Sequence, residues 1–167
     1  MQKYPATIIL RHRRENLKKC SLRGLEELSS FSFYTYPKDH LPEHAGYILL
    51  SLGEKELSYE DKDYGIYLID GTWKLASKMD KTLPFHPEKR SLPKGFKTAY
   101  RRRQEDCEDP ESGLASIEAL YIAYVILDRT DESLLDNYHF KDEFLAKNHE
   151  LLQKYTNRDH KLCNNCH

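Results

Sequence analysis

Three short apolar runs, each rich in β-branched or aromatic residues, constrain the fold of this chain more than any other feature. They cover residues 6–11, 46–53 and 65–70, and polar or helix-like segments separate them. Runs of this length and composition predict buried β-strands. Because strands that alternate with helices form a parallel sheet with helices on its faces, we expect a mainly parallel α/β fold.

The segments between and after these runs predict helices. We expect helices at residues 17–28, 72–79, 116–129 and 141–155, and one more short strand at residues 96–98. The third helical segment has apolar or aromatic side chains on almost every side, so it should lie buried against the sheet. Ser116 is the residue expected to cap its amino end. The fourth segment is amphipathic, with its apolar residues towards the core.

The length of 167 residues fits a single domain, which we expect to span residues 1–157, followed by a polar, disordered tail at 158–167. Charged residues make up 32% of the chain, and no apolar stretch approaches the ~20 residues of a membrane-spanning helix. The amino-terminal segment lacks the long apolar core of a signal peptide. Four cysteines without an export signal predict free thiols in a reducing compartment, so we expect a cytoplasmic protein.

Positive charge is concentrated in two segments, although the net charge is only -1. Residues 11–23 hold six Lys or Arg and one acid, and residues 88–104 hold seven and one. These cations either form one phosphate-binding face or lie in solvated loops where nearby acids balance them. Arginine binds phosphate through two parallel hydrogen bonds, so we interpret the arginines as an RNA-binding set. The candidates are Arg11, Arg13, Arg14, Arg101, Arg102 and Arg103.

Asp70 stands where the third apolar run ends, just before Gly71, Thr72 and the only tryptophan, Trp73. In an open α/β sheet, ligands bind at the carboxyl ends of the strands. Asp70 is therefore either the cap of the following helix or a catalytic carboxylate, and the local pattern favours the cap. Thr72 fits a helix cap as well as a ligand contact, and Trp73 fits core packing as well as a pocket wall.

Three sequence blocks together resemble the DTW-domain family of RNA aminocarboxypropyltransferases, which is related to the SPOUT methyltransferases. The blocks are LIDGTWKLASKM, LPKGFKTAYRRRQ and GLASIEALYIAYVIL, in the family's order and approximate spacing. The matching residues are Asp70, Thr72, Trp73, Tyr100, Arg103, Gly113, Leu114, Ser116, Glu118 and Ala119. The segments LKKCSLRGLEEL and FLAKNHELLQKY also resemble the sister group that modifies small-subunit rRNA. The chain departs from these groups in lacking an Asn-rich stretch at residues 98–104 and an amino-terminal cysteine cluster.

The resemblance implies an enzyme with a SPOUT-like α/β fold and a trefoil knot, which we place at residues 93–127. Such an enzyme binds S-adenosylmethionine without a metal and transfers its 3-amino-3-carboxypropyl group to a uridine-type base in RNA, with rRNA favoured over tRNA. The sulfonium activates the adjacent carbon, so the protein must orient the cofactor and accept a proton. Asp70 is the catalytic candidate, either as that proton acceptor or as a partner of the cofactor's amino group. The cofactor-binding candidates are Thr72, Trp73, Gly113, Leu114 and Ser116.

Two other functions stay open: an RNA methyltransferase on the same fold, and a non-catalytic RNA-binding or ribosome-assembly module. Glu118 fits a favourable charge at the start of a helix better than a catalytic role. The Cys and His residues of the tail do not fit a haem attachment site, and they fit a disordered tail or at most a weak metal site. They are His160, Cys163, Cys166 and His167. We expect no metal, no membrane contact and no obligate protein partner.

Overall fold

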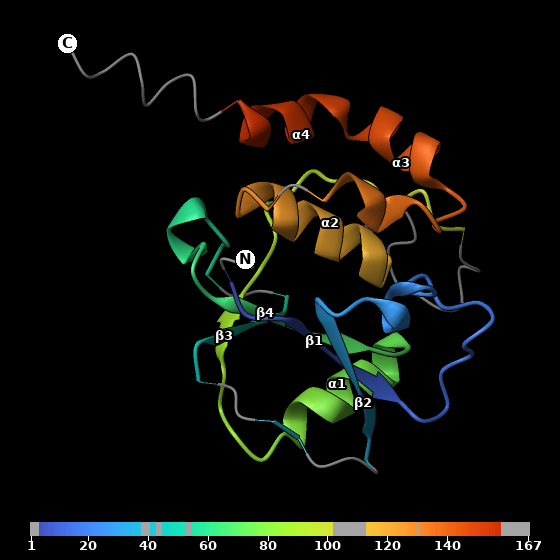
Figure 1. The fold of residues 1–167 in the computed structure, drawn as a ribbon, viewed down its shortest axis with the longest axis vertical. Helices are drawn as coiled ribbons and strands as arrows, with labels where there is room; N and C mark the ends of the chain where they lie inside the picture. The colour runs from blue at the N-terminus through green and yellow to red at the C-terminus, as the bar shows by residue number, and fades with distance from the viewer. Residues whose placement is uncertain are drawn as a thin grey trace.

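The chain folds around a five-stranded sheet in which the strand pairings are parallel (Figure 1). The computed structural model describes residues 4–37, 41–42, 45–52, 55–101, 113–129 and 131–157. The predicted tail at residues 158–167 lies outside this description. In the order β2-β1-β4-β3-β5, the strands are β1 (Thr7–His12), β2 (Phe31–Tyr36), β3 (Tyr47–Leu50), β4 (Gly65–Asp70) and β5 (Glu88–Arg90). The expected mainly parallel α/β fold is confirmed.

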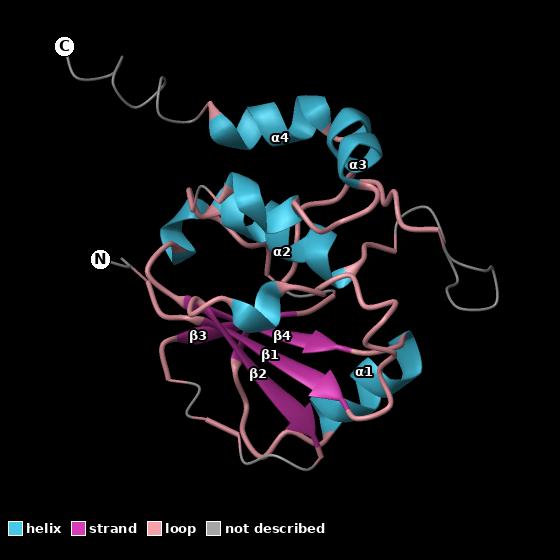
Figure 2. Cartoon of the chain, turned by 45° about the vertical axis from the view of Figure 1, so that its right-hand side comes forward, coloured by secondary structure: helices cyan, strands magenta, loops and turns pink. Residues whose placement is uncertain are grey.

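Helices form layers on both faces of the sheet (Figures 1 and 2). They are α1 (Trp73–Lys81), α2 (Ser116–Ile126), α3 (Lys141–Lys147) and α4 (His149–Thr156). α1 covers one face and α2 the other, while α3 and α4 form an outer layer over α2. Short 3-10 helices occur at Leu25–Glu27, Tyr59–Asp61 and Glu132–Leu135. In the described part of the chain, no helix has the length and apolar character needed to cross a membrane.

The alternation of side chains along the strands decides which residues reach each side of the sheet. Ile9 packs in the larger core on the α2 side, whereas Leu10 packs in the smaller core on the α1 side. Because successive side chains of a strand alternate, Arg11 follows Ile9 to the α2 side and His12 follows Leu10 to the α1 side. Asp70, which is paired with Arg11 across the sheet, also reaches the α2 side, where it meets the start of that helix.

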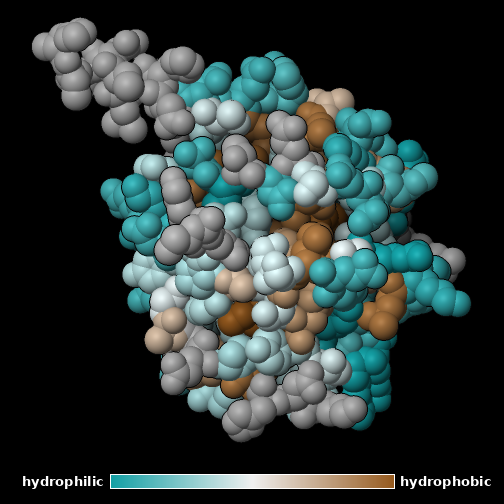
Figure 3. Space-filling model, viewed as in Figure 1, coloured by the Kyte–Doolittle hydropathy of each residue, from teal (hydrophilic) through white to brown (hydrophobic). Residues whose placement is uncertain are grey.

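The expected burial of α2 is confirmed. Ile117, Leu120 and Ile126 are at most 1% exposed, and the outer layer of α3 and α4 covers the side of α2 turned away from the sheet. On the face shown in Figure 3, hydrophobic residues gather over the middle of the molecule and hydrophilic residues surround them. The cap position of α2 belongs to Ala115 and not to Ser116 as predicted, because the Ser116 hydroxyl is directed to another partner.

The predicted helix at residues 17–28 is wrong, because this segment consists of turns and the 3-10 helix Leu25–Glu27. Gly24 has a φ of 97°, in the left-handed region, which a right-handed helix does not allow. The apolar residues of the segment anchor a loop instead: Cys20 is 7% exposed and Leu22 is fully buried. Their spacing resembles that of a helix, but tertiary packing overrides the local preference.

Three strand assignments also differ from the sequence analysis. The sequence analysis does not predict β2, whose residues FSFYTY are aromatic except for Ser32 and Thr35 and are mostly half-buried at the sheet edge. The predicted strand at residues 96–98 does not form, and β5 occupies the opposite edge. The charged sequence EKR of β5 suits an edge strand, where side chains reach solvent, but it gives no apolar pattern to detect.

The predicted helix at residues 141–155 is interrupted at Asn148, where α3 ends and α4 begins. Asn148 has φ -112° and ψ 10°, away from helical values. Its side chain accepts a hydrogen bond from the Lys97 N–H at 2.7 Å and donates one to the Lys97 carbonyl at 2.8 Å. The interruption therefore places a buried amide where it holds the segment that follows β5.

Candidate functional site

Asp70 ends β4 and lies at the centre of a buried polar cluster, being 5% exposed. Its Oδ1 accepts a hydrogen bond from Ser116 Oγ at 2.7 Å, and its Oδ2 accepts from the Cys20 thiol at 3.2 Å and from Arg11 Nε at 3.4 Å. The preferred reading of Asp70 as a helix cap is wrong, since Thr72 holds the cap position of α1. The carboxylate instead joins β1, the loop after β1, β4 and the start of α2.

Arg11 is 8% exposed and uses its guanidinium inside the protein. Nη1 donates to the Glu26 carboxylate at 3.0 Å, Nη2 donates to the Cys20 sulfur at 3.4 Å, and the group lies 4.6 Å from the centre of the Phe33 ring. The guanidinium is thus directed to partners within the protein, Asp70, Cys20 and the exposed Glu26, and contact of Arg11 with RNA stays a prediction. The guanidinium balances the charge of Asp70, which would otherwise be costly to bury.

The loop at residues 13–24 docks against the start of α2. Ser21 Oγ accepts a hydrogen bond from the Ile117 N–H at 3.3 Å, which satisfies one of the free amides at the amino end of the helix. Burial, reinforced by the charge of Asp70, raises the pKa of the Cys20 thiol to about 12. The thiol therefore stays protonated and donates its hydrogen bond to Asp70. The Lys-Cys-Ser block thus supports the site structurally.

Glu15 brings a second carboxylate to this edge of the sheet. Ligand atoms of Glu15, Cys20 and Asp70 all lie within 4.8 Å of one another. Burial, together with the charge of Asp70, raises the pKa of Glu15. These residue types can bind metals, but a protonated thiol and the guanidinium of Arg11 beside Asp70 disfavour a divalent ion.

The structure places the predicted cofactor-binding residues on two neighbouring segments. Thr72 is exposed at the start of α1, and Trp73 is the first residue of that helix, with a side chain outside the described part. Gly113 and Leu114 are half-buried just before α2. Ser116 links the two segments through its hydrogen bond to Asp70. The segments therefore meet at the carboxyl end of β4.

Glu118, in the first turn of α2, is a fully buried carboxylate that binds three donors. It accepts hydrogen bonds from Thr98 Oγ1 at 2.6 Å, from the Ala99 N–H at 2.8 Å and from the Ala115 N–H at 2.7 Å. A favourable charge at the helix start describes only part of this role. The sequence analysis misses Thr98, whose only signal is its position inside the second family-like block.

A group of cations lies on the α1 side of the same edge. Arg13 and Arg14 are exposed in the turn after β1, which contact with RNA requires. His12 Nδ1 accepts a hydrogen bond from the Arg14 N–H at 3.1 Å. Burial and the charges of Arg14, Arg13 and Lys78 lower the pKa of His12, so its imidazole is mostly neutral at pH 7. Helix α1 thus adds Lys78, which the sequence analysis does not single out.

Arg101 lies elsewhere, so the predicted arginines do not form one cluster. Its Nη2 is 3.5 Å from the Glu143 carboxylate, and its guanidinium lies 5.8 Å from the centre of the Phe140 ring, next to α3. It therefore belongs to the α2 side of the sheet, whereas Arg13 and Arg14 are grouped with α1. Arg102 and Arg103 lie outside the described residues.

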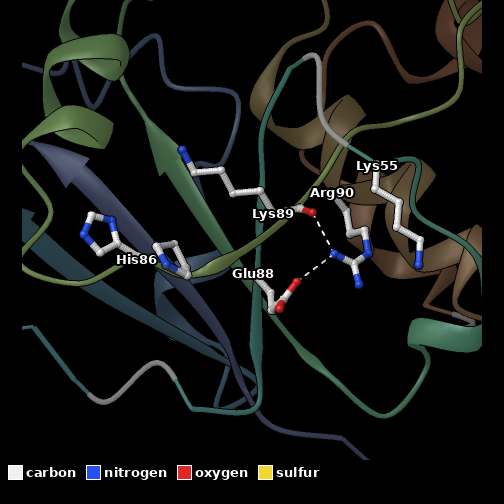
Figure 4. A pocket seen from close by; sticks show the side chains of 6 residues that line it. Lys55, His86, Glu88, Lys89 and Arg90 are labelled. Carbon is white, nitrogen blue, oxygen red and sulfur yellow. Dashed lines mark hydrogen bonds and ion pairs between the residues drawn. The ribbon is translucent and has the colours of Figure 1, made fainter.

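An open depression of 440 Å³ lies at β5 (Figure 4), and neither Asp70 nor its hydrogen-bond partners line it. Lys55, His86 and residues 87–90 line it. Its cations are largely neutralised within the protein: Arg90 Nη1 donates to Glu88 at 3.1 Å, and Lys89 Nζ lies 3.0 Å from the Asp80 carboxylate. The depression thus differs from the Asp70 edge, and it brings together none of the residues predicted to act.

The fold and the site define a parallel α/β protein whose polar cluster lies at the carboxyl end of a central strand, where such sheets bind ligands. The chain belongs to the family described as "Ribosome biogenesis protein, C-terminal", which matches residues 47–163. A relative from Methanocaldococcus jannaschii, named 16S rRNA aminocarboxypropyltransferase, is 31% identical over 85% of this chain and 81% of its own length. A relative of the same name from Sulfurisphaera tokodaii is 30% identical, over 90% of this chain and 86% of its own length.

A solved structure shares the fold. It is the SAM-dependent rRNA:acp-transferase Tsr3 from Vulcanisaeta distributa, with a TM-score of 0.70 over 91% of this chain and 83% of that chain. Its sequence identity is 23%, so this likeness concerns the architecture alone. The names of the two relatives agree with the rRNA-modifying sister group that the segments LKKCSLRGLEEL and FLAKNHELLQKY resemble.

Proposed function

We propose that this chain transfers the 3-amino-3-carboxypropyl group of S-adenosylmethionine to a uridine-type base of small-subunit rRNA. The observation that carries the proposal is the 31% identity to the Methanocaldococcus jannaschii 16S rRNA aminocarboxypropyltransferase over 85% of this chain. The Asp70 cluster supports it, because the cluster lies at the sheet edge where α/β proteins bind ligands.

The electrostatics of the cluster suit this cofactor. S-adenosylmethionine carries positive charge at its sulfur and at its amino group, and its sulfonium supplies an activated carbon. Glu15 and Asp70 place negative charge at the edge, and Arg11 offsets part of it. The protein then has to hold the cofactor in one orientation and let the base nitrogen lose its proton.

We propose that the cofactor lies between the loop after β4 and the segment before α2. Thr72 and Trp73 belong to the first of these, and Gly113, Leu114 and Ser116 belong to the second. The 2.7 Å hydrogen bond between Ser116 and Asp70 supports this placement, because it holds the two segments together.

Asp70 is the carboxylate that we propose to act on the cofactor. Both of its oxygens accept hydrogen bonds, and the side chain is 5% exposed. Both proposed roles, orientation of the cofactor's amino group and removal of the base proton, require this carboxylate to come within hydrogen-bond reach of the group concerned.

For the RNA, we propose contacts with the cationic group formed by Arg13, Arg14 and Lys78. They are close enough to His12 to lower its pKa, so they form one positive surface beside the proposed cofactor site. Arg101 would make a separate contact from the α3 side, and Arg102 and Arg103, which lie outside the described residues, remain RNA-binding candidates from the sequence. Phosphate contacts of this kind position an RNA without reading its sequence.

We also propose the finer features that the resemblance implies: a SPOUT-type trefoil knot, one domain over residues 1–157, and a cytoplasmic enzyme that prefers rRNA to tRNA. The knot proposal is supported by the path of the chain after β5. Lys97 is hydrogen-bonded to Asn148, and Ala99 is hydrogen-bonded to Glu118 of α2, so this segment is bound from two sides.

A double-label assay tests the function. The purified protein is incubated with small-subunit rRNA and S-adenosylmethionine labelled either in the carboxyl carbon or in the methyl group. Transfer of the aminocarboxypropyl group places the carboxyl label in the RNA and releases methylthioadenosine. Entry of the methyl label, with release of S-adenosylhomocysteine, would identify a methyltransferase instead. RNA binding without transfer of either label would identify a non-catalytic module, and tRNA serves as the comparison substrate.

A further inference from the structure

Glu118 holds more of the chain than a helix cap requires. A glutamate in the first turn of a helix commonly accepts the backbone N–H of the cap residue, here Ala115 at 2.7 Å. Glu118 accepts two more hydrogen bonds, from Thr98 Oγ1 and from the Ala99 N–H, which lie 20 and 19 residues earlier in the chain. These two bonds connect segments that are distant in the sequence, and they do not cap the amino end of α2.

The segments that Glu118 connects are those on either side of residues 102–112. One contains Thr98 and Ala99, and the other contains Ala115, directly after the predicted cofactor residues Gly113 and Leu114. A single carboxylate is therefore hydrogen-bonded to both segments. In Figure 1 the yellow-green chain after β5 passes between α2 and the outer layer formed by α3 and α4.

The same segment is held from its other side by the helix junction. Asn148, which is 2% exposed, forms two hydrogen bonds with the backbone of Lys97, and Glu118 is fully buried. Thr98 Oγ1 also accepts a hydrogen bond from the Tyr100 N–H at 2.9 Å. The backbone at residues 97–100 is therefore fixed by two buried side chains on opposite sides.

The bonds of Glu118 require a group that only accepts hydrogen bonds. All three of its partners donate, so an ionised carboxylate satisfies every one of them. A glutamine at this position would direct its NH₂ group at a donor, because only one of its two terminal atoms accepts. Glu118 is also two residues from Ser116, whose hydroxyl donates to Asp70 at 2.7 Å, so the first turn of α2 joins Glu118 to the Asp70 cluster.

We propose that Glu118 is a positioning residue for S-adenosylmethionine: its carboxylate holds the segments at residues 97–100 and 113–115 in the arrangement that the cofactor binds. This inference rests on the proposed function. In this proposed role, Glu118 touches neither the cofactor nor the RNA, and it acts through the backbone of the two segments. A loss of Glu118 should therefore weaken cofactor binding while leaving the transfer step nearly intact once the cofactor is bound.

The test compares Glu118→Gln and Thr98→Val with the matched control Glu150→Gln, which changes an exposed glutamate in the first turn of α4. We expect Glu118→Gln to raise the Kd for S-adenosylmethionine by roughly tenfold or more, the scale of one supporting hydrogen bond. Thr98→Val should give a smaller increase and leaves Glu118 charged, so it keeps the test informative if Glu118→Gln does not fold. At saturating cofactor, kcat should stay within about threefold of wild type, since the loss is in ground-state binding.

A destabilised core variant, Leu135→Ala, separates affinity from stability. Leu135 is 1% exposed in the 3-10 helix Glu132–Leu135, and its truncation should lower Tm without changing the Kd at temperatures where the protein is folded. If Glu118→Gln and Thr98→Val bind the cofactor as tightly as wild type and differ only in Tm, the positioning role is overturned. If the wild-type protein itself does not bind S-adenosylmethionine, the proposed function fails, and this inference fails with it.

Discussion

Asp70 is the residue on which the two proposed roles differ, and Asp70→Asn distinguishes them. The amide removes the negative charge and turns an NH₂ group towards Ser116, Cys20 or Arg11, so we expect a stability loss of about 1–3 kcal/mol. If Asp70 orients the cofactor, affinity and rate fall together. If it accepts the base proton, kcat falls by roughly a hundredfold while the Kd for the cofactor changes little.

The measurement for Asp70 is a cofactor titration combined with single-turnover transfer, below the Tm of the variant. Asp142→Asn, an exposed acid in the first turn of α3, is the control for charge removal. Unchanged transfer by Asp70→Asn would exclude both roles and leave only the structural junction seen around this carboxylate.

The raised pKa of the Cys20 thiol predicts that the free energy of unfolding decreases at alkaline pH. This thiol has a pKa raised from the ordinary 9.0 to about 12 by burial and by Asp70, so the folded protein keeps this proton more tightly than the unfolded chain. The neutral thiol therefore contributes its full stabilisation of the folded state below about pH 9, and this contribution is lost as the pH rises towards 12. Cys20→Ser keeps a donor to Asp70 but does not titrate in this range.

Urea unfolding between about pH 8 and 11, a range that begins below the ordinary pKa of a thiol and covers most of the interval up to the raised one, measures the effect of Cys20. The difference in unfolding free energy between wild type and Cys20→Ser should narrow by up to about 1 kcal/mol per pH unit above pH 9. The other cysteines are common to both proteins and cancel. A difference that is constant with pH would contradict a thiol that is neutral and buried.

At the level of single residues, the sequence identified Asp70 and Ser116 but not the partners that surround them. The position of Asp70 at the end of a strand follows from the local pattern, because the apolar run stops at this acid in the sequence. Its bonds to Arg11 and Cys20 depend on the order of the strands and on the path of a loop that local preference assigns to a helix. The residues next to Asp70 in the sequence predict neither the strand order nor the loop. Glu118 is visible as a helix-start acid, but its bonds to Thr98 and Ala99 come from segments far away in sequence.

The interruption between α3 and α4 has a structural role, because it places Asn148 against the segment that follows β5. Asn148 there forms three side-chain hydrogen bonds, two with Lys97 and one to the Phe144 carbonyl. Asn148→Ala leaves the Lys97 backbone groups unpaired in a buried place, so we expect a loss of about 2–4 kcal/mol in unfolding free energy. Urea unfolding measures it, with the exposed Asn157→Ala as the control, which should change stability by less than about 0.5 kcal/mol.

A weak effect of Asn148→Ala, near that of the control, would mean that the junction does not hold the segment after β5.

Apolar periodicity could not have revealed the interruption between α3 and α4, because residues on both sides of Asn148 continue one amphipathic pattern. The same limit explains β2 and β5. Central strands such as β1 and β4 carry continuous apolar runs and were predicted, whereas the edge strands β2 and β5 are mostly only half-buried and lack that signal.

For the whole molecule, charge separation has a measurable consequence although the net charge is only -1. Arg13 and Arg14, with Lys78, form a positive surface on the α1 side, and this surface is the proposed place for RNA phosphates. Phosphate binding should offset the repulsion that these cations exert on His12. We therefore expect the pKa of His12, which is now lowered, to rise when RNA binds.

Binding of a small-subunit rRNA fragment measured at several salt concentrations tests this surface. Each phosphate neutralised contributes about 0.7–0.9 to the slope of log Kobs against log salt, so the double variant Arg13→Gln/Arg14→Gln should make the slope shallower by about 1.5. The control Lys62→Gln/Lys154→Gln removes two exposed charges, one after the 3-10 helix Tyr59–Asp61 and one from α4, and should leave the slope unchanged. In wild type, the NMR titration of the His12 ring should shift to higher pH with RNA present. An unchanged slope in the arginine variant, together with an unshifted His12, would place the RNA on another face of the molecule.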